Sequence, residues 1–162
     1  MKIVLAIDGS DFSKAAVKEL AKMPLPNNSE VSVINVYEHP AMSTPELVST
    51  KFALYNYYQD FIKNAQKIGE NIVSEAVKVL KEKNGSLTIT TSVVSGLPKK
   101  EILEKAESFD ADLIVVGSQG QGAFSRLLLG SVSQYLATHA KYSVMIVKEK
   151  EDAQAFINKN KA

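Results

Sequence analysis

Residues 112–133 read DLIVVGSQGQGAFSRLLLGSVS, and this stretch decides which fold the chain adopts. Its start, 112–117, is the most continuously apolar strand pattern in the sequence, which is typical of a strand buried on both faces of a parallel sheet. A glycine-rich loop over 117–130 follows, and residues 131–141 then have the apolar spacing of an amphipathic helix. A buried strand, a glycine-rich turn and a helix in this order predict one unit of an α/β fold.

The same alternation of strand and helix patterns continues over the rest of the chain. Strands are predicted over 2–8, 30–37, 87–94, 112–117 and 143–148. Helices are predicted over 13–22, over a long stretch that ends near Lys83, from Pro98 onward, and over 131–141. This order predicts a single-domain α/β fold, with a five-stranded parallel sheet and helices on both of its faces. The domain is predicted to cover 1–148, and a polar tail, 149–162, follows it.

The connections and helix ends carry further signals. Ser10 or Asp11 has the side chain of an N-cap for the first helix. The loop after the second strand contains two prolines, and the composition of 38–50 is that of a mobile flap, although the sequence does not specify whether the loop closes over a ligand. The N-terminal part of the long helix is predicted to project beyond the sheet, and it contains Phe52, Tyr55, Tyr57 and Tyr58.

The composition excludes several classes of function. The 162 residues include 19 Lys and Arg against 18 Asp and Glu, which gives a net charge of +1. Binding to nucleic acid or to an anionic membrane through a broad basic surface needs a larger excess, so neither partner is predicted. The absence of cysteine excludes disulfides and thiolate metal sites. The apolar runs are too short for a signal peptide or a membrane span, which favours a cytoplasmic protein.

Small and polar residues gather after two of the predicted strands. In an open α/β sheet, ligands bind beyond the carboxyl ends of the strands, where the strand order reverses. The first strand ends in Asp8, Gly9 and Ser10. The fourth strand is followed by Gly117, Ser118, Gln119 and Gly120, and the next helix opens with Gly130, Ser131, Val132 and Ser133.

This set of residues predicts an anion site. Glycine lets backbone N–H groups approach a ligand closely, and a helix N-terminus adds about half a positive charge. Ser131 and Ser133 place hydroxyls at that terminus, and Arg126, inside the loop, supplies a cation. Phosphate fits such a cradle. The alternative is that these residues only cap helices and turn corners.

Two common phosphate-binding motifs do not fit the loop. A Walker A motif requires G-x-x-x-x-G-K-[ST], but neither Gly-Lys-Ser nor Gly-Lys-Thr occurs in the chain. A Rossmann G-x-G-x-x-G motif that starts at Gly120 has Ser125 in place of its third glycine. It also follows the fourth strand, whereas the Rossmann motif follows the first.

The spacing Gly117-x2-Gly120-x9-Gly130-Ser131 resembles another pattern, the ATP-binding signature G-x2-G-x9-G-[S/T] of the universal stress protein family. The opening KIVLAIDGSDFSKAA is similar to that family's first strand and turn, with Asp8, Ser10 and Ser13 in the matching places. The resemblance runs from Lys2 to about Lys148, in the same order of strands and helices.

The resemblance implies a fold with strand order 3-2-1-4-5, flavodoxin-like in outline, and an ATP site between the first and fourth strands. It implies that Asp8 bonds the ribose and that main chain near Val36 reads the adenine edge. Gly117 and Gly120 would let the loop wrap the ribose and phosphates. Gly130, Ser131 and Ser133 would hold the triphosphate, whose oxygens a divalent cation, Mg²⁺ or Mn²⁺, would bridge. The resemblance also implies a homodimer through the fifth strand, Val144–Val147.

Two positions depart from the family pattern. Gln119 stands where many members have histidine, and an amide hydrogen-bonds but does not titrate. Ser143 stands where many members have proline before the last strand, which affects strand entry and the geometry of the expected dimer.

The sequence does not predict an enzyme. His39 and His139 are the only histidines, and neither forms a recognisable catalytic set with a serine or a carboxylate. A two-component receiver needs an acidic pair after the first strand, where Asp8 stands alone, and GSDFS is a poor flavin phosphate loop. Three functions remain: an ATP-binding regulatory or protective protein of the stress response, a slow ATPase or self-phosphorylating protein, and an interaction dimer with an empty pocket.

Overall fold

The computed structural model describes residues 1–38, 51–121 and 129–149. Nine elements alternate along the chain: β1 (Lys2–Ala6), α1 (Asp11–Lys22), β2 (Glu30–Tyr37), α2 (Lys51–Lys83), β3 (Thr88–Ser95), α3 (Pro98–Phe109), β4 (Leu113–Gly117), α4 (Ser131–His139) and β5 (Ser143–Val147). The five strands form one parallel sheet in the order β3-β2-β1-β4-β5. The α/β class and the expected strand order 3-2-1-4-5 are therefore confirmed.

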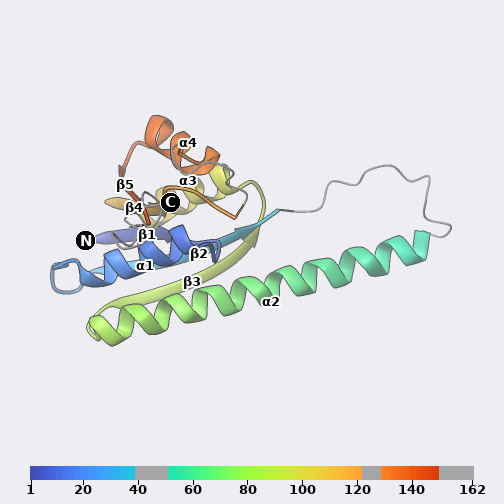
Figure 1. Cartoon of the computed structure of the whole chain (residues 1–162), viewed down its shortest axis with the longest axis horizontal. Coiled ribbons are helices and arrows are strands. Elements are labelled where there is room, and N and C mark those ends of the chain that lie inside the picture. The colour runs from blue at the N-terminus through green and yellow to red at the C-terminus, as the bar shows by residue number, and fades with distance from the viewer. Residues whose placement is uncertain (39–50, 122–128, 150–162) are drawn as a thin grey trace, which may run out of the picture.

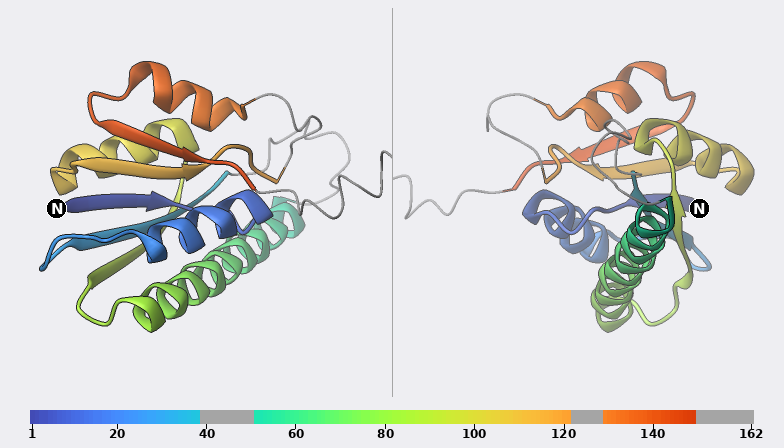
Figure 2. Two further views of the ribbon diagram at one scale, coloured as in Figure 1. Left: turned by 60° about the vertical axis from the view of Figure 1, so that its left-hand side comes forward. Right: turned by 90° about the vertical axis from the view of Figure 1, so that its right-hand side faces the viewer.

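The helices cover the sheet on both faces, as the alternation predicted. Figures 1 and 2 show α1 and α2 on one face and α3 and α4 on the other. The central strand β1 serves both layers because successive side chains of a strand point to opposite faces. Ile3, Leu5 and Ile7 pack into the core beneath α1 and α2, whereas Val4 and Ala6 pack into the core beneath α3 and α4.

The first strand is shorter than predicted. It ends at Ala6, not at residue 8, although the Ile7 N–H still donates to the Ile34 carbonyl oxygen at 3.0 Å. The chain turns after Ile7 because Gly9 adopts a φ of +85°, in the left-handed region that glycine tolerates. The first helix then begins at Asp11, two residues earlier than predicted, with Ser10 as its N-cap.

The last helix is also shorter than predicted. It ends at His139, because Ala140 adopts an extended conformation with φ −69° and ψ 138°. The other boundaries differ from the prediction by a residue or less where both ends were stated, which is the usual uncertainty at element ends.

The long helix α2 has two unlike parts. Its C-terminal part packs on the sheet and buries Gly69, Val73, Ala76 and Leu80. Its N-terminal part projects beyond the sheet, as predicted (Figure 1), and leaves the Tyr55 and Tyr57 side chains 61% and 65% exposed. The expected flap, 38–50, lies outside the described residues except for Glu38, and so does the Phe52 side chain. None of the described helices combines the length and the hydropathy that a bilayer crossing requires.

Candidate functional site

A cavity of about 360 Å³ opens at the carboxyl ends of β1, β2 and β4, on the face covered by α3 and α4. This is the end of the sheet where the strand order reverses between β1 and β4. Most of the predicted site residues line it: Asp8, Val36, Gly117, Gln119, Gly120, Gly130, Ser131, Val132 and Ser133. The structure therefore brings together residues that lie far apart in the chain, from Asp8 at the end of the first strand to Ser133 in the last helix.

The cavity has an apolar side and a polar side. Strand β2 and helix α3 supply apolar groups, from Ile34, Val36, Pro98 and Ile102. The loop after β4 and the start of α4 supply amide, hydroxyl and main-chain groups, and the end of β1 adds the carboxylate of Asp8. A ligand that fits must therefore have an apolar part and a polar or charged part.

Helix α4 presents an open N-terminus to the polar side. Its N-cap is Gly130, which has no side chain to bond the N–H groups of the first turn. The Gly130 N–H donates to the Ser118 carbonyl oxygen at 2.8 Å, which holds the helix start against the β4 loop. The N–H groups of Ser131, Val132 and Ser133 thus stand at the cavity, together with the positive end of the helix dipole.

Ser133 lines the cavity, and its hydroxyl also makes bonds within the protein. Its side chain is buried, and its hydroxyl donates to the Ser118 carbonyl oxygen at 2.7 Å or to that of Gly130 at 2.9 Å. The hydroxyl proton is therefore used inside the protein, and Ser133 locks the loop to the helix. Ser131 is exposed at the cavity and keeps the position of a ligand-facing hydroxyl.

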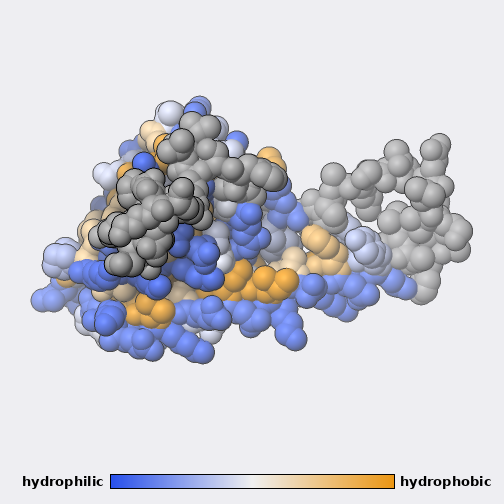
Figure 3. Space-filling model, viewed as in Figure 1, coloured by the Kyte–Doolittle hydropathy of each residue, from blue (hydrophilic) through white to orange (hydrophobic). Residues whose placement is uncertain are grey.

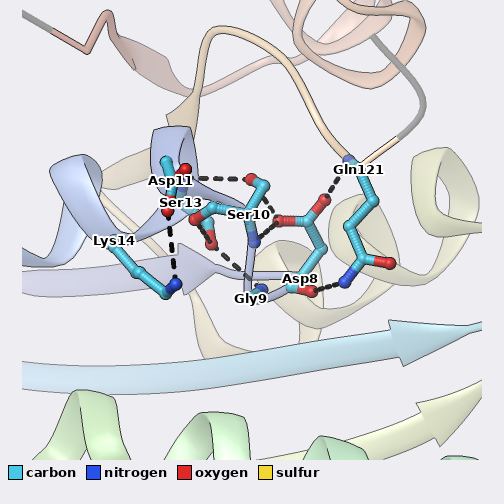
Figure 4. Close-up of polar contacts among 7 residues, drawn as sticks. All are labelled: Asp8, Gly9, Ser10, Asp11, Ser13, Lys14 and Gln121. Carbon is cyan, nitrogen blue, oxygen red and sulfur yellow. Dashed lines mark hydrogen bonds and ion pairs between the residues drawn. The ribbon is translucent and has the colours of Figure 1, made fainter.

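Asp8 closes a clasp between the end of β1 and the loop after β4 (Figure 4). One carboxylate oxygen accepts from the Ser10 N–H at 3.0 Å and from the Ser10 hydroxyl at 2.6 Å. The other accepts from the Gln121 N–H at 3.0 Å, and the Gln121 side-chain amide donates to the Asp8 carbonyl oxygen. A carboxylate has about four acceptor positions, so Asp8 retains capacity for a ligand hydroxyl.

Gly9 and Ser10 support the turn and do not line the cavity. The Ser10 hydroxyl accepts from the Ser13 N–H at 3.2 Å and so caps α1. The Ser13 hydroxyl accepts from the Gly9 N–H at 3.1 Å and donates to the Ser10 carbonyl oxygen at 2.9 Å. Gly9 and Ser10 thus form the turn and cap α1, and neither lies at the surface of the cavity.

The three signature glycines are required by contacts within the protein. A Cβ on Gly117 would lie 2.7 Å from the Phe12 carbonyl carbon, so β4 could not pack against the start of α1. A Cβ on Gly120 would lie 2.8 Å from an Asp8 carboxylate oxygen. A Cβ on Gly130 would lie 3.1 Å from the Gln119 Cα. Their spacing in the sequence thus encodes the close packing that shapes the cavity.

Several lining residues were not predicted as site residues. They are Ala6, Ile7, Ser13, Ile34, Pro98, Ile102 and Val116. Ile34 precedes Val36 by two residues and so shares its face of β2, which is a signal that the sequence did contain. Among the predicted residues, Ser118 is buried and contributes its carbonyl oxygen to the loop, and Arg126 lies outside the described residues.

The cavity offers few groups for a metal ion. Among the described residues, no group of three or more His, Asp or Glu side chains is placed to hold one. Asp8 is the carboxylate that lines the cavity. A cation here would need most of its oxygen ligands from a bound phosphate or from water.

Known proteins match this chain in sequence over most of its length. The model of the universal stress protein family matches residues 1–148. Universal stress protein MJ0531 of Methanocaldococcus jannaschii is 32% identical over 154 residues, which cover 91% of this chain and 82% of that protein. Universal stress protein YxiE of Bacillus subtilis is 29% identical over 147 residues, which cover 91% of this chain and 98% of that protein.

Solved structures are similar to this chain over nearly its whole length. The protein MJ0577 superposes with a TM-score of 0.76 at 22% identity and covers 93% of this chain and 97% of its own. A universal stress protein in complex with cAMP gives a TM-score of 0.60 at 27% identity, with 91% and 96% covered. A family member from Arabidopsis thaliana with AMP bound gives 0.62 at 19% identity, with 94% of each chain covered.

Proposed function

The chain belongs to the universal stress protein family, and from this premise we propose that it is an ATP-binding regulatory or protective protein of the stress response, acting in the cytoplasm. One observation carries the proposal. The cavity combines an apolar side from β2 and α3 with the open N-terminus of α4, which is the combination that a base joined to a phosphate chain requires.

The cavity suggests how ATP binds. The adenine ring lies against the apolar side, near Ile34, Val36 and Ile102. The ribose hydroxyls donate to Asp8, and the phosphates meet the α4 N-terminus at Gly130 and Ser131. Mg²⁺ or Mn²⁺ would neutralise the phosphate charge, with most of its oxygen ligands supplied by the nucleotide and by water. The relatives solved with cAMP and AMP support the adenine-nucleotide part of this assignment, since each binds an adenine nucleotide on the same fold.

The proposal gives ATP a regulatory role without efficient turnover. His139 is engaged at the far end of α4, where its ring stacks on Tyr135 with centroids 4.1 Å apart and its Nδ1 lies 3.0 Å from the Tyr135 carbonyl oxygen. His39 lies outside the described residues. Slow ATP hydrolysis or self-phosphorylation remains the second candidate, because the exposed Ser131 hydroxyl stands at the phosphate end of the cavity.

Mass spectrometry of nucleotide released from the purified protein tests the function, followed by calorimetric titration of the nucleotide-free protein with ATP and Mg²⁺. We expect adenine nucleotide to copurify and to rebind with one site per chain. If neither experiment detects adenine nucleotide, the binding proposal is wrong and the interaction-dimer function takes its place. Phosphate release that depends on the cavity would favour the slow ATPase.

The proposal includes a homodimer through β5, Val144–Val147. β5 is an edge strand of the sheet, and edges with unpaired backbone groups favour pairing with another chain. Light scattering coupled to size exclusion should report a dimer. Val144→Lys at this edge should give a monomer, whereas Thr90→Lys on the opposite edge strand, β3, should not. A wild-type monomer at micromolar concentration would contradict the dimer.

A further inference from the structure

A second cavity of about 380 Å³ lies on the opposite face of the sheet, between α1 and α2. It opens beside the same end of β1 as the first cavity, and Ile7 and Ser13 line both. None of the signature glycines Gly117, Gly120 and Gly130 lines it. The family signature therefore does not account for it.

The floor of this cavity is apolar. It consists of Ile7, Val17, Ile72, Ala76 and Val79, which belong to the α1–α2 core or pack against it. Figure 3 shows hydrophobic residues in a band along α2 on this side of the molecule. Ile72 reaches the end of the cavity because Gly9 has no Cβ, which would lie 2.9 Å from the Ile72 Cδ1. The apolar floor thus continues up to the β1–α1 turn.

The rim of the cavity carries more basic than acidic side chains. Lys14 and Lys18 stand one turn apart on α1 and line the same wall. Glu75 on α2 is the acidic residue that lines the cavity. The Lys14 ammonium lies 3.3 Å from the exposed Asp11 carboxylate, whereas no ion pair joins Lys18 to another described residue. The α1 wall therefore offers at least one ammonium group that is available to an anion.

We propose that this second cavity binds a small amphipathic carboxylate. The aliphatic chain lies on the floor formed with Ile72 and Val79, and the carboxylate pairs with Lys18 and Lys14. The volume is near the lower end of the range for small-molecule sites, about 300–1,000 Å³, so a short-chain acid fits and a lipid with several chains does not. The proposal is independent of nucleotide binding at the first cavity.

Octanoate is the probe that tests this site, with octylamine as a probe of equal chain length and opposite charge. Both are titrated into the full-length protein by calorimetry and by methyl NMR, without nucleotide. We expect octanoate to bind and to shift the methyl signals of Ile72 and Val79, and octylamine to bind at least about tenfold more weakly. Equal or tighter binding of octylamine would assign the head group to Glu75 and overturn the proposal.

Exposed lysines provide variants that keep the fold. Lys18→Glu should weaken octanoate binding at least about tenfold, and Lys22→Glu, the same change one turn further along α1 and outside the cavity, should not. Octanoate shifts confined to Ile34 and Ile102 would place the acid in the first cavity and overturn the proposal. Absence of octanoate binding in a protein that still binds ATP would overturn this inference and leave the proposed function intact.

Discussion

Two cavities of similar volume, about 360 and 380 Å³, open at the carboxyl end of β1, one on each face of the sheet. They obtain positive potential from different sources. The first uses backbone N–H groups at the start of α4, whereas the second uses the ammonium groups of Lys14 and Lys18. A net charge of +1 therefore says little about either, because backbone groups are absent from the charge count and two lysines barely change it.

The two cavities should tolerate substitution to different degrees. A cavity built from backbone groups depends on glycines that let main chains approach, so a single Cβ disturbs it. A cavity with lysines on its rim depends on flexible, exposed side chains, which can be exchanged without disturbing the fold. The backbone-based cavity should thus show the larger mutational effects.

Among these substitutions, Gly130→Val should cause the largest loss of ATP affinity. The β-branched side chain would press on the Gln119 Cα, 3.1 Å from the new Cβ, and on the Ser118 carbonyl oxygen at 3.4 Å, at the point where the phosphates are proposed to bind. We expect ATP affinity to fall at least about 100-fold, or about 3 kcal/mol, in a calorimetric titration.

Gly85 provides the matched control for that variant. A Cβ on Gly85 would have the Lys81 carbonyl oxygen as its nearest neighbour, at 4.0 Å, in an exposed turn far along the chain from the cavity. Gly85→Val should leave ATP affinity unchanged. Unchanged affinity in Gly130→Val as well would remove the α4 N-terminus from the proposed site.

Asp8→Asn should have the next largest effect, and it tests the ribose contact. Exchange of the carboxylate for an amide removes a charge-assisted acceptor, which is worth about 1.5–3 kcal/mol, or roughly a 10- to 100-fold loss of affinity. Dideoxy-ATP, which lacks the ribose hydroxyls, separates this contact from the clasp with Gln121. If Asp8 bonds the ribose, the variant and the wild type should bind dideoxy-ATP nearly equally. An equal loss for both nucleotides would mean that Asp8 acts only through the clasp.

The fold was predictable from the sequence because its signals are local and repeated. Continuous apolar runs such as 113–116 and helical spacing in α1 are set by which neighbours in the chain share a face. The polar side of the first cavity was predictable for a similar reason, since Gly130 and Ser131 stand together at a helix start.

The apolar side of that cavity and the whole second cavity depend on tertiary packing. Ile102 lines the first cavity because α3 lies across β1 and β2, and no spacing in the sequence specifies that placement. Lys14 and Ile72 meet at the second cavity only because α2 packs beside α1. A pair of lysines one turn apart is a common surface pattern, so it carried no signal by itself.

Two single variants, Ser131→Ala and Ser133→Ala, separate a hydroxyl that contacts the ligand from one that holds the loop after β4 against α4. Ser131→Ala should lower ATP affinity about three- to tenfold and leave the melting temperature unchanged, because its hydroxyl is exposed. Ser133→Ala should lower the free energy of unfolding by about 1 kcal/mol, because the buried hydroxyl can no longer donate to the Ser118 or Gly130 carbonyl oxygen. Calorimetry and thermal denaturation on both variants measure the two effects. The reverse pattern would make Ser133 the phosphate ligand.

Gln121→Ala should have the smallest effect on ATP affinity. Gln121 lies between the two cavities. Gln121 lines the second cavity, and its side chain donates to the carbonyl oxygen of Asp8, which lines the first. Loss of one exposed hydrogen bond should weaken ATP binding about two- to threefold, as measured by calorimetry. Gln66→Ala is the control, since its amide also makes one exposed bond, to Glu70 at 3.3 Å, away from both cavities. Unchanged ATP affinity in Gln121→Ala would show that the bond from its side chain to the Asp8 carbonyl oxygen does not support the first cavity.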